Sequence, residues 1–273
     1  MTDPVFVVPD LTAQLAAVGE TGEFTLPASE AKHASVKRIR QGEAVVLTDG
    51  SGTGVAGTWN SSGGSGGTVT GQRRVDEDTP RPRVTVVQAI PKSERAELAV
   101  DLAVQAGADR IIPWQADRCV SRWTGKSDKA DKSAKARSRW EATAVSAMKQ
   151  SRRLSGAHVG DLLTDIAELP AHLADRPWGQ DEDQHEGQDA AARVRVLVLH
   201  EDAATPLRDV DLDVDEVVLV VGPEGGVSDR EIAAGTGAQD GPASVLGPEG
   251  LRTATAAAVA LGAIGVLTTR WGR

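Results

Sequence analysis

The segment Glu216-Val-Val-Leu-Val-Val-Gly-Pro-Glu-Gly-Gly-Val-Ser228 sets the fold of the larger part of this chain. The apolar run predicts a buried strand over 216–221, a glycine-rich turn follows, and Ser228 is positioned as the N-cap of a helix. Strand, turn and helix in this order build a parallel α/β sheet, in which ligands bind beyond the carboxyl ends of the strands. Glycines let the backbone approach a ligand closely, although the same residues also build turns that bind nothing.

A second segment, Val245-Leu-Gly-Pro-Glu-Gly-Leu-Arg-Thr-Ala-Thr255, repeats this design. Its Gly-Pro step lies 25 residues after the first, so the two turns are expected to form two walls of one pocket. Arg252 stands at the start of the following helix, where its charge opposes the helix dipole at a cost of about 0.3–1 kcal/mol unless a partner compensates. The alternative is an exposed Arg252 that turns into water.

A third predicted strand, 194–199, ends at Leu199-His200-Glu201 and brings a titratable pair to the same edge. Such a His-Glu step is more often ordinary surface polarity than a catalytic pair. Neither Gly-Pro turn carries the Gly-Lys-Ser/Thr of a phosphate-binding loop, and the third glycine of a dinucleotide fingerprint is out of place. A nucleotide-dependent oxidoreductase is therefore disfavoured.

The rest of the chain from Arg83 onward continues the alternation of strand and helix, which predicts a parallel α/β sheet. The expected strands are 84–90, 110–113, 194–199, 216–221 and 244–246, and the expected helices are 93–106, 133–153, one from Ser228, and 253–267. Residues 175–192, rich in acidic residues, are predicted to be a disordered surface loop. The small residues of 253–267 suit either a dimerisation surface or a buried core helix.

The first 75 residues have a different pattern, in which short strands alternate with turns. Strands are expected at 5–8, 23–26, 44–48 and 68–70, with one helix over 28–40. Asp49-Gly50 is a strong hairpin signal, and the glycine- and serine-rich 61–67 is predicted to be a flexible tip that buries nothing. This pattern favours a small β-barrel over 1–76, a linker over 75–82, and an α/β domain over 82–273.

Composition narrows the class of protein. Hydrophobic residues at 40% and charged residues at 25% are typical of a globular chain. No apolar run approaches the ~18 residues of a membrane helix, and the first residues show no secretory signal, so a cytoplasmic protein without a membrane partner is expected. A single cysteine, Cys119, excludes an internal disulfide and a cysteine-rich zinc site, and no metal is expected.

Charge is unevenly distributed. The net charge is −9, but residues 1–153 hold 22 of the 30 basic residues and only 18 of the 39 acidic ones. An anionic partner would therefore meet the first 150 residues. Arginines and tryptophans among these positions suit phosphate contacts and base stacking, whereas lysine-only runs are usually solvated faces. The basic groups are Lys32, Lys37, Arg38, Arg40, Arg73 and Arg74, and Lys126, Lys129, Lys132, Lys135, Arg137, Arg139, Lys149, Arg152 and Arg153, with Trp123 and Trp140 among the latter.

Six motifs, in the right order, resemble those of the RsmE family of bacterial 16S rRNA uridine N3-methyltransferases, in the SPOUT (trefoil-knot) class. They span nearly the whole chain and are specific only in combination. The motifs are His33-Ala-Ser-Val-Lys-Arg-Ile-Arg-Gln-Gly42 with Leu47-Thr-Asp-Gly50; Ala89-Ile-Pro-Lys92 with Glu97; Gly107-Ala-Asp-Arg-Ile-Ile-Pro113 with Arg118-Cys119; Lys149-Gln-Ser-Arg-Arg153; Gly222-Pro-Glu-Gly-Gly226 with Ser228 and Glu231; and Leu246-Gly-Pro248 with Leu251-Arg-Thr253.

The resemblance implies a PUA-like RNA-binding β-barrel followed by a SPOUT α/β domain with a C-terminal trefoil knot. It further implies S-adenosyl-L-methionine as cofactor, a homodimer, and 16S rRNA of the 30S ribosomal subunit as partner, with N3-methyluridine as product. The implied cofactor-binding residues are Leu199, His200, Gly222, Pro223, Glu224, Gly226, Leu246, Gly247, Leu251, Arg252 and Thr253. The implied RNA-binding residues are Lys32, Arg38, Arg40, Lys92, Arg118, Arg152 and Arg153.

Arg252 and Glu224 are the candidate catalytic residues, with Glu201 as a further candidate base. The chain departs from the family pattern at Ala254, where many relatives carry a glutamate, and at Glu249-Gly250. Two other functions remain open. One is a related SPOUT methyltransferase that acts on another RNA or position, and the other is a non-enzymatic RNA-binding or ribosome-assembly protein.

Overall fold

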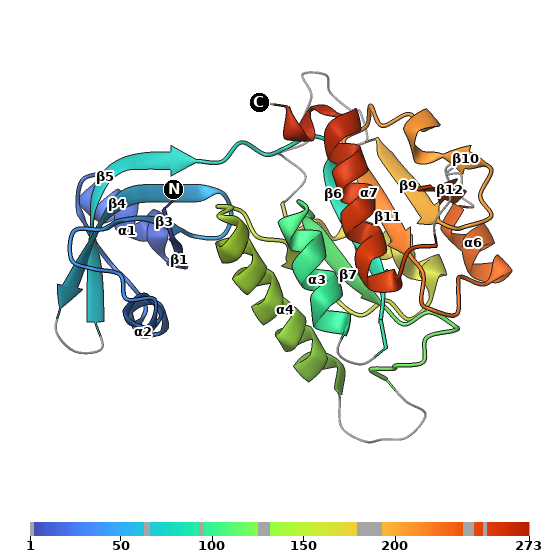
Figure 1. Ribbon diagram of the computed structural model, residues 1–273, viewed down its shortest axis with the longest axis horizontal. Helices are drawn as coiled ribbons and strands as arrows, with labels where there is room; N and C mark the ends of the chain where they lie inside the picture. Colours follow the sequence, from blue (N-terminus) through green and yellow to red (C-terminus); the bar gives the residue numbers. More distant parts are fainter. Residues whose placement is uncertain are drawn as a thin grey trace. The chain divides into compact units, whose positions relative to one another are not determined.

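The structure is a computed structural model that describes residues 3–62, 66–92, 95–124, 132–178, 193–236, 243–247 and 250–272 (Figure 1). The chain forms two compact units. Unit 1 comprises Met1–Thr79 and Val145–Gly156, and unit 2 comprises Pro80–Ala144 and Ala157–Arg273. Each unit has its own sheet. Within the described ranges, no helix is both long and apolar enough to cross a membrane.

Unit 2 is built on a sheet that, in the described part of the chain, has seven strands in the order β10-β12-β9-β11-β6-β7-β8. Every neighbouring pair in this sheet is parallel. The prediction of a parallel α/β fold is therefore confirmed. The strands are β6 (Arg83–Ala89), β7 (Arg110–Trp114), β8 (His158–Val159), β9 (Val194–Leu199), β10 (Thr205–Pro206), β11 (Glu216–Val221) and β12 (Ala243–Val245).

Helices cover both faces of this sheet. On one face, α3 (Arg95–Gln105) and α7 (Thr253–Leu267) lie side by side, and α7 also packs on β6 and β11 (Figure 1). On the other face, α6 (Asp229–Thr236) packs on β9 and on the 3-10 turn Ile166–Glu168, which continues into α5 (Leu169–Ala174). The helix α4 (Lys132–Ser151) belongs to unit 2 up to Ala144 and to unit 1 from Val145.

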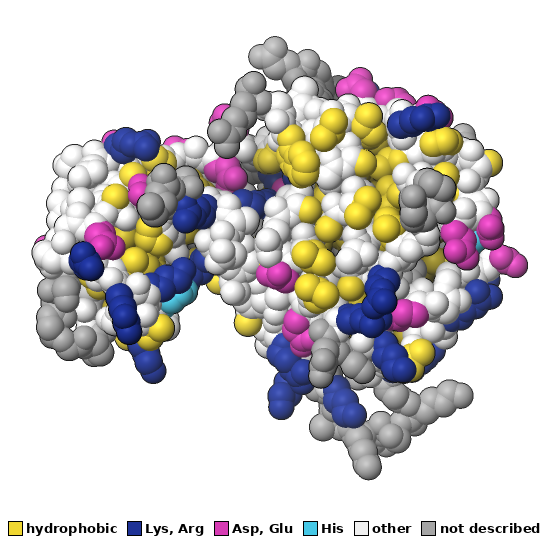
Figure 2. Space-filling model, in the orientation of Figure 1, with side chains coloured by type: hydrophobic (Ala, Val, Ile, Leu, Met, Phe, Trp, Pro, Cys, Tyr) yellow, Lys and Arg dark blue, Asp and Glu magenta, His cyan; other side chains and the backbone are white. Residues whose placement is uncertain are grey.

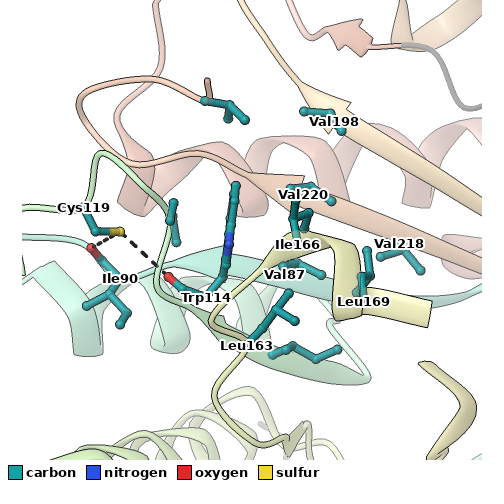
Figure 3. Packing of buried hydrophobic residues seen from close by; sticks show 14 residues of the cluster. Val87, Ile90, Trp114, Cys119, Leu163, Ile166, Leu169, Val198, Val218 and Val220 are labelled. Carbon is teal, nitrogen blue, oxygen red and sulfur yellow. Dashed lines mark hydrogen bonds between the residues drawn. The ribbon is translucent and has the colours of Figure 1, made fainter. Parts of the chain in front are cut away.

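The side chains of β11 alternate between the two faces of the sheet, so this one strand contributes to the core on both faces. Val217 to Val220 are all fully buried, because alternate side chains point to opposite faces and both faces are covered. Val218 and Val220 join a cluster with Trp114, Ile166 and residues of neighbouring strands (Figure 3). The core therefore runs continuously through the centre of the sheet.

The strand order is not the order of the sequence. β11 lies between β6 and β9, and β12 lies on the far side of β9. The next helix, α7, nevertheless packs on α3, β6 and β11. The chain between β12 and α7 must therefore return across the edge of the sheet where β9 and β11 end.

Unit 1 contains a sheet whose five strands, in the described part of the chain, have the order β1-β3-β4-β5-β2. β1 and β3 are parallel and the other neighbours are antiparallel. The predicted hairpin at Asp49-Gly50 is confirmed, because Asp49 Oδ1 accepts from the backbone N of Ser51 at 2.8 Å and Gly50 has φ +87°. The strands are β1 (Val5–Val7), β2 (Glu23–Thr25), β3 (Ala44–Thr48), β4 (Thr53–Ser62) and β5 (Gly66–Asp76).

Several local expectations for unit 1 were wrong. The helix α1 (Leu11–Val18) and the long strand β4 were not predicted, and α2 (Ala28–Val36) ends earlier than expected, before Arg38 at φ +58°. The glycine-rich tip does bury a residue. Gly67 is buried, and a Cβ on it would lie 1.9 Å from a ring carbon of Trp59. Residues 63–65 of that tip lie outside the described residues.

Two segments predicted to be loose carry specific contacts. In unit 1, Glu77 Oε2 accepts from the backbone N of Leu154 at 2.9 Å and of Ser155 at 2.7 Å. In unit 2, Arg176 Nη2 lies 3.4 Å from Glu216 Oε2, although 175–192 was predicted to be disordered. Residues 179–192 of that loop lie outside the described residues. Both segments thus contain a charged side chain with a specific partner inside its own unit.

Candidate active site

The main candidate site is a cavity of about 940 Å³ at the carboxyl edge of the sheet in unit 2. It lies where the neighbouring strands β12, β9 and β11 end, the position at which open α/β sheets bind ligands. All eleven predicted cofactor-binding residues line it, from all three strand ends. Further lining residues are Arg95, Ala203, Pro206, Leu207, Arg208, Val221, Val227, Ser244, Val245, Gly250, Ala254 and Ala256.

The first Gly-Pro turn depends on close backbone approach. The backbone N of Gly226 donates to the carbonyl of Pro223 at 2.9 Å, and Gly226 adopts φ +75°. A Cβ on Gly222 would lie 2.5 Å from Cγ2 of the buried Val227. The turn therefore needs glycine at 222 for space and at 226 for conformation.

A capping box holds the end of this turn at the start of α6. The hydroxyl of Ser228 donates to Glu231 Oε2 at 2.8 Å, and the backbone N of Ser228 donates to the same oxygen at 2.9 Å. The other oxygen of Glu231 accepts from the backbone N of Asp117 at 2.8 Å. Glu231 is 2% exposed, so it is a buried carboxylate that ties the turn to the segment after β7. Ser228 Oγ in turn accepts from the backbone N of Glu231 at 3.3 Å, so the prediction that Ser228 caps a helix is confirmed.

Two further contacts brace the first turn from outside. Arg118 Nη1 donates to the carbonyl of Gly225 at 3.2 Å, and Glu224 Oε1 accepts from the backbone N of Lys92 at 3.1 Å. Both Arg118 and Lys92 were predicted to bind RNA. Neither residue lines the cavity, but each supports the turn through these bonds, and their contact with RNA stays a prediction.

The second Gly-Pro turn leads into α7, and its described residues are Leu246, Gly247 and 250–253. Arg252 is the N-cap residue, and its carbonyl accepts from the backbone N of Thr255 and of Ala256. Its exposed guanidinium has no hydrogen bond or ion pair to another described residue. Among the described residues, nothing compensates this charge at the positive end of α7, and Arg252 lines the cavity as a cation.

The titratable groups at the site differ in how they are held. His200 Nδ1 accepts from the backbone N of Asp202 at 3.2 Å, which fixes the ring beside the end of β9. Glu201 is exposed, and it lines the cavity beside His200. Glu224 lines it too, but one of its oxygens is engaged by Lys92. Burial raises the pKa of the Cys119 thiol, so this cysteine stays protonated and serves the core beneath the site (Figure 3).

Arg95 and Arg208 line the cavity and were missed by the sequence interpretation. Arg95 is the first described residue of α3, and Arg208 lies in the 3-10 turn after β10. Neither belongs to a Gly-Pro turn, and β10 is only two residues long. Two residues are too few to show an alternation of apolar and polar side chains. The sequence therefore gave no sign that the turn after β10 reaches the site.

The other predicted RNA-binding residues lie in unit 1. Lys32 is exposed on α2, Arg38 and Arg40 follow that helix, and Arg152 and Arg153 follow α4. Within unit 1, Lys149 Nζ donates to both oxygens of Glu30 at 2.7 Å and lies 2.8 Å from His33 Nδ1. This contact between the last turn of α4 and α2 places the two basic groups in one region of unit 1.

No group of three or more His, Cys, Asp or Glu side chains is arranged to hold a metal ion in the part of the chain that the structure describes.

Comparisons with known proteins agree with this architecture. A family model described as "RNA methyltransferase domain" matches residues 77–265. The ribosomal RNA small subunit methyltransferase E of Mycobacterium bovis is 45% identical over 240 residues, which cover 87% of this chain and 84% of that protein. Two solved structures share the fold over nearly their full lengths. The ribosomal RNA small subunit methyltransferase E of Neisseria gonorrhoeae, solved with S-adenosyl methionine bound, has a TM-score of 0.78 and 23% sequence identity, and the match covers 98% of each chain. A probable rRNA-methyltransferase from Porphyromonas gingivalis has a TM-score of 0.70 and 26% sequence identity, and the match covers 98% of this chain and 99% of that one.

The matched region contains every residue that lines the cavity, and the six sequence motifs resemble those of the same proteins. The chain belongs to the RNA methyltransferase family whose members include the ribosomal RNA small subunit methyltransferases E.

Proposed function

We propose that this protein transfers a methyl group from S-adenosyl-L-methionine to N3 of a uridine in 16S rRNA of the 30S ribosomal subunit. The observation that carries the proposal is the convergence of eleven predicted cofactor-binding residues on one cavity. Family membership supports the reaction class, and the motifs that resemble the uridine N3-methyltransferases support the position. A ribosomal substrate would place the protein in the cytoplasm.

The cavity fits the proposed methyl donor in size and chemistry. A volume of about 940 Å³ is at the upper end of the range for small-molecule sites. Leu199, Leu246 and Leu251 supply apolar walls for an adenine ring, and the glycines of both turns let backbone groups approach it. The first turn of α7 offers its positive dipole end to the carboxylate of the methionine part.

The cofactor would supply an electrophilic methyl on a sulfonium, and this chain would supply alignment and charge. Uridine N3 bears a proton at neutral pH, and methylation requires that this proton leave, either to a base of the chain or to water while a cation stabilises the anionic ring. In this proposal Arg252 stabilises negative charge on the uracil oxygens, and its place in the cavity lining supports that role. Glu224 can act as base only through its second oxygen, because Lys92 engages the first.

A trefoil knot is also part of the proposal. Its support is the path of the chain after β12, which returns across the ends of β9 and β11 so that α7 can pack on α3 and β6. Short connections between sequential neighbours would not produce this strand order. A crossing segment that lines the cavity would couple the knot to cofactor binding.

For residues 1–76 we propose a PUA-like barrel that binds RNA, beside a methyltransferase domain over 82–273. The exposed Lys32, Arg38 and Arg40 and the neighbouring Arg152 support phosphate contacts. The affinity for small-subunit RNA should then fall steeply as salt rises from 50 to 200 mM. Filter binding at several salt concentrations measures this slope, and an affinity independent of salt would contradict the assignment.

A homodimer is supported by an apolar face on α3, α7 and the residues that follow α7. Figure 2 shows hydrophobic side chains gathered over these helices. The most exposed are Leu98, Val259, Val266, Leu267 and Trp271, which are 44–75% exposed. Such a patch is typical of a surface that another chain covers. Sedimentation analysis of the wild type and of Val266→Glu tests this, with a monomeric wild type as the contrary result.

The activity itself is tested by mass spectrometry of rRNA from a strain that lacks the gene. We expect one N3-methyluridine in 16S rRNA to disappear and to return when the wild-type gene is restored. Loss of a methyl group elsewhere in RNA would identify a related methyltransferase of different specificity. An unchanged RNA, together with no calorimetric binding of S-adenosylmethionine, would favour a non-enzymatic RNA-binding protein.

A further inference from the structure

A second cavity, of about 380 Å³, lies in unit 2 between the first turns of α3 and the part of α4 before Ala144. Its walls combine two tryptophans with an arginine, a glutamate and a serine. Nothing in the proposed reaction uses it. Aromatic and guanidinium groups beside a few polar atoms are the features with which proteins bind unpaired bases of RNA.

The aromatic wall is held in place. The rings of Trp123 and Trp140 meet edge to face, with centroids 5.0 Å apart. Trp140 is 1% exposed, whereas Trp123 is only partly buried. Gln115, itself 8% exposed, accepts through Oε1 from the backbone N of Trp123 at 2.8 Å and of Thr124 at 3.0 Å. The bonds to Gln115 hold the backbone at Trp123, and the contact with Trp140 orients its indole, which lowers the entropy cost of stacking.

The polar wall has unused hydrogen-bonding capacity. Arg139 Nη1 and Glu97 Oε1 are 3.9 Å apart, which is too long for a hydrogen bond, and their side chains are 61% and 40% exposed. They present a donor fork beside an acceptor at the mouth of the cavity. The edge of a nucleobase carries the complementary acceptors and donors.

The two cavities share a wall. Arg95 lines the first, and its neighbours Ala96 and Glu97 line the second. Pro91 lines the second, and the next residue, Lys92, donates its backbone N to Glu224 in the first. An RNA with one nucleotide in the first cavity can therefore place a nearby nucleotide in the second.

The charge around the second cavity suits RNA. Lys92, Arg95 and Lys132 are exposed near its walls. In Figure 2 the dark-blue side chains gather around the lower ends of α3 and α4, as these helices are drawn in Figure 1. Cations of this kind attract the phosphate backbone without reading sequence, so specificity rests on the cavity itself.

We propose that the second cavity binds one unpaired base of the rRNA substrate near the target uridine. The base stacks on Trp123, and Arg139 and Glu97 bind its edge. This inference rests on the proposed function, because it concerns a nucleotide that accompanies the target. It makes Trp123 and Arg139 residues that position the RNA and set its specificity, and it assigns them no part in methyl transfer.

The first experiment measures methyl transfer to 30S subunits from a strain that lacks the gene. Stacking on one aromatic residue accounts for roughly tenfold in affinity. We expect Trp123→Leu and Arg139→Gln each to raise the KM for 30S subunits about tenfold. The kcat and the KM for S-adenosylmethionine should stay near wild type, and Trp123→Phe should restore the KM. The matched control is Lys135→Gln. It removes one exposed charge from α4, one helical turn before Arg139 and outside the cavity lining. If neither pocket variant exceeds that control, the proposal is wrong.

The second experiment does not depend on catalysis. A labelled single-stranded RNA hexamer and an abasic hexamer of the same backbone are titrated against the protein with saturating S-adenosylhomocysteine. Wild type should bind the RNA about tenfold more tightly than Trp123→Leu, and both should bind the abasic hexamer equally. Equal RNA binding by both proteins would overturn the base pocket. If the wild type methylates nothing yet shows this difference, the proposed reaction fails while the pocket stands.

Discussion

The two Gly-Pro turns have the same sequence design but different support. The first turn is held by hydrogen bonds at three residues: Arg118 bonds to Gly225, Lys92 to Glu224, and Glu231 to Ser228. In the second, no side chain of the described residues 246, 247 and 250–253 has a hydrogen bond. A Cβ on Gly222 would clash, whereas one on Gly250 would meet nothing within 4 Å.

This difference suggests a division of labour. The first turn is a preorganised wall, whose shape exists before a ligand arrives, and preorganisation reduces the cost of binding. The second turn carries the cation Arg252, and its described side chains are not held by hydrogen bonds of this kind. We therefore expect a substitution that disturbs the packing of the first turn to affect cofactor affinity, and loss of the Arg252 charge in the second turn to affect the chemical step.

The largest expected effect is that of Arg252→Ala. If Arg252 stabilises charge that develops on uracil, its loss should lower kcat about 100-fold or more while the fold remains intact. The control is Arg208→Ala, because Arg208 lines the same cavity but lies beside Asp209. Single-turnover methylation measures both variants. Near-wild-type turnover of Arg252→Ala would remove the residue from the mechanism.

A pair of glycine substitutions compares the two turns directly. Gly222→Ala should weaken S-adenosylmethionine binding about tenfold or more, because Val227 must move to admit the methyl group. Gly250→Ala should change the affinity less than about twofold, since the space is open. Calorimetric titration gives both values. Equal effects of the two substitutions would show that the turns do not differ in rigidity.

The capping box is tested through stability. Glu231→Gln puts an amide where two backbone N–H groups and a hydroxyl need an acceptor, which should lower the free energy of unfolding by about 1–3 kcal/mol. Glu201→Gln, at an exposed position, should have little effect. Urea denaturation compares the two, and an unchanged Glu231→Gln protein would show that the first turn does not depend on this brace.

The smallest effect concerns unit 1. Burial, and then the charge of Lys149, lower the pKa of His33 below its ordinary value of 6.5. The unfolded chain then takes up a proton at higher pH than the folded one, so stability is fully present above about pH 6.5 and falls as pH drops toward the folded pKa. His33→Gln should reduce this loss between pH 7.5 and 5.5 in urea denaturation. An unaltered pH profile would remove His33 as its source.

The long strands and helices of unit 2 could be predicted because burial on two faces leaves long apolar runs, as in 216–221 and 194–199. The convergence of three strand ends followed from the rule for parallel sheets. The clash at Gly222, the brace from Arg118 and the cavity between α3 and α4 could not be predicted. Each depends on atoms that come together from distant parts of the sequence, such as Gly225 and Arg118, which are 107 residues apart.

In unit 1 the errors have a local cause. α1 was missed because it buries only Leu11 fully, which leaves a weak helical pattern. β4 carries glycines at 54 and 57, which lower strand propensity, yet a Cβ at either position would clash with the neighbouring strand β5. The close packing of β4 against β5 thus requires glycine at these two positions, although glycine has a low propensity for strands.

The central claim is that the cavity at the ends of β9, β11 and β12 binds the methyl donor. Calorimetric titration of S-adenosylmethionine against three proteins tests it most directly: wild type, Leu246→Trp, which adds bulk to the cavity wall, and Val36→Trp, which adds the same bulk at an exposed position of unit 1. We predict one saturable site per chain in wild type and Val36→Trp, and none in a folded Leu246→Trp. Undiminished binding by Leu246→Trp, or no binding by the wild type, would contradict the account.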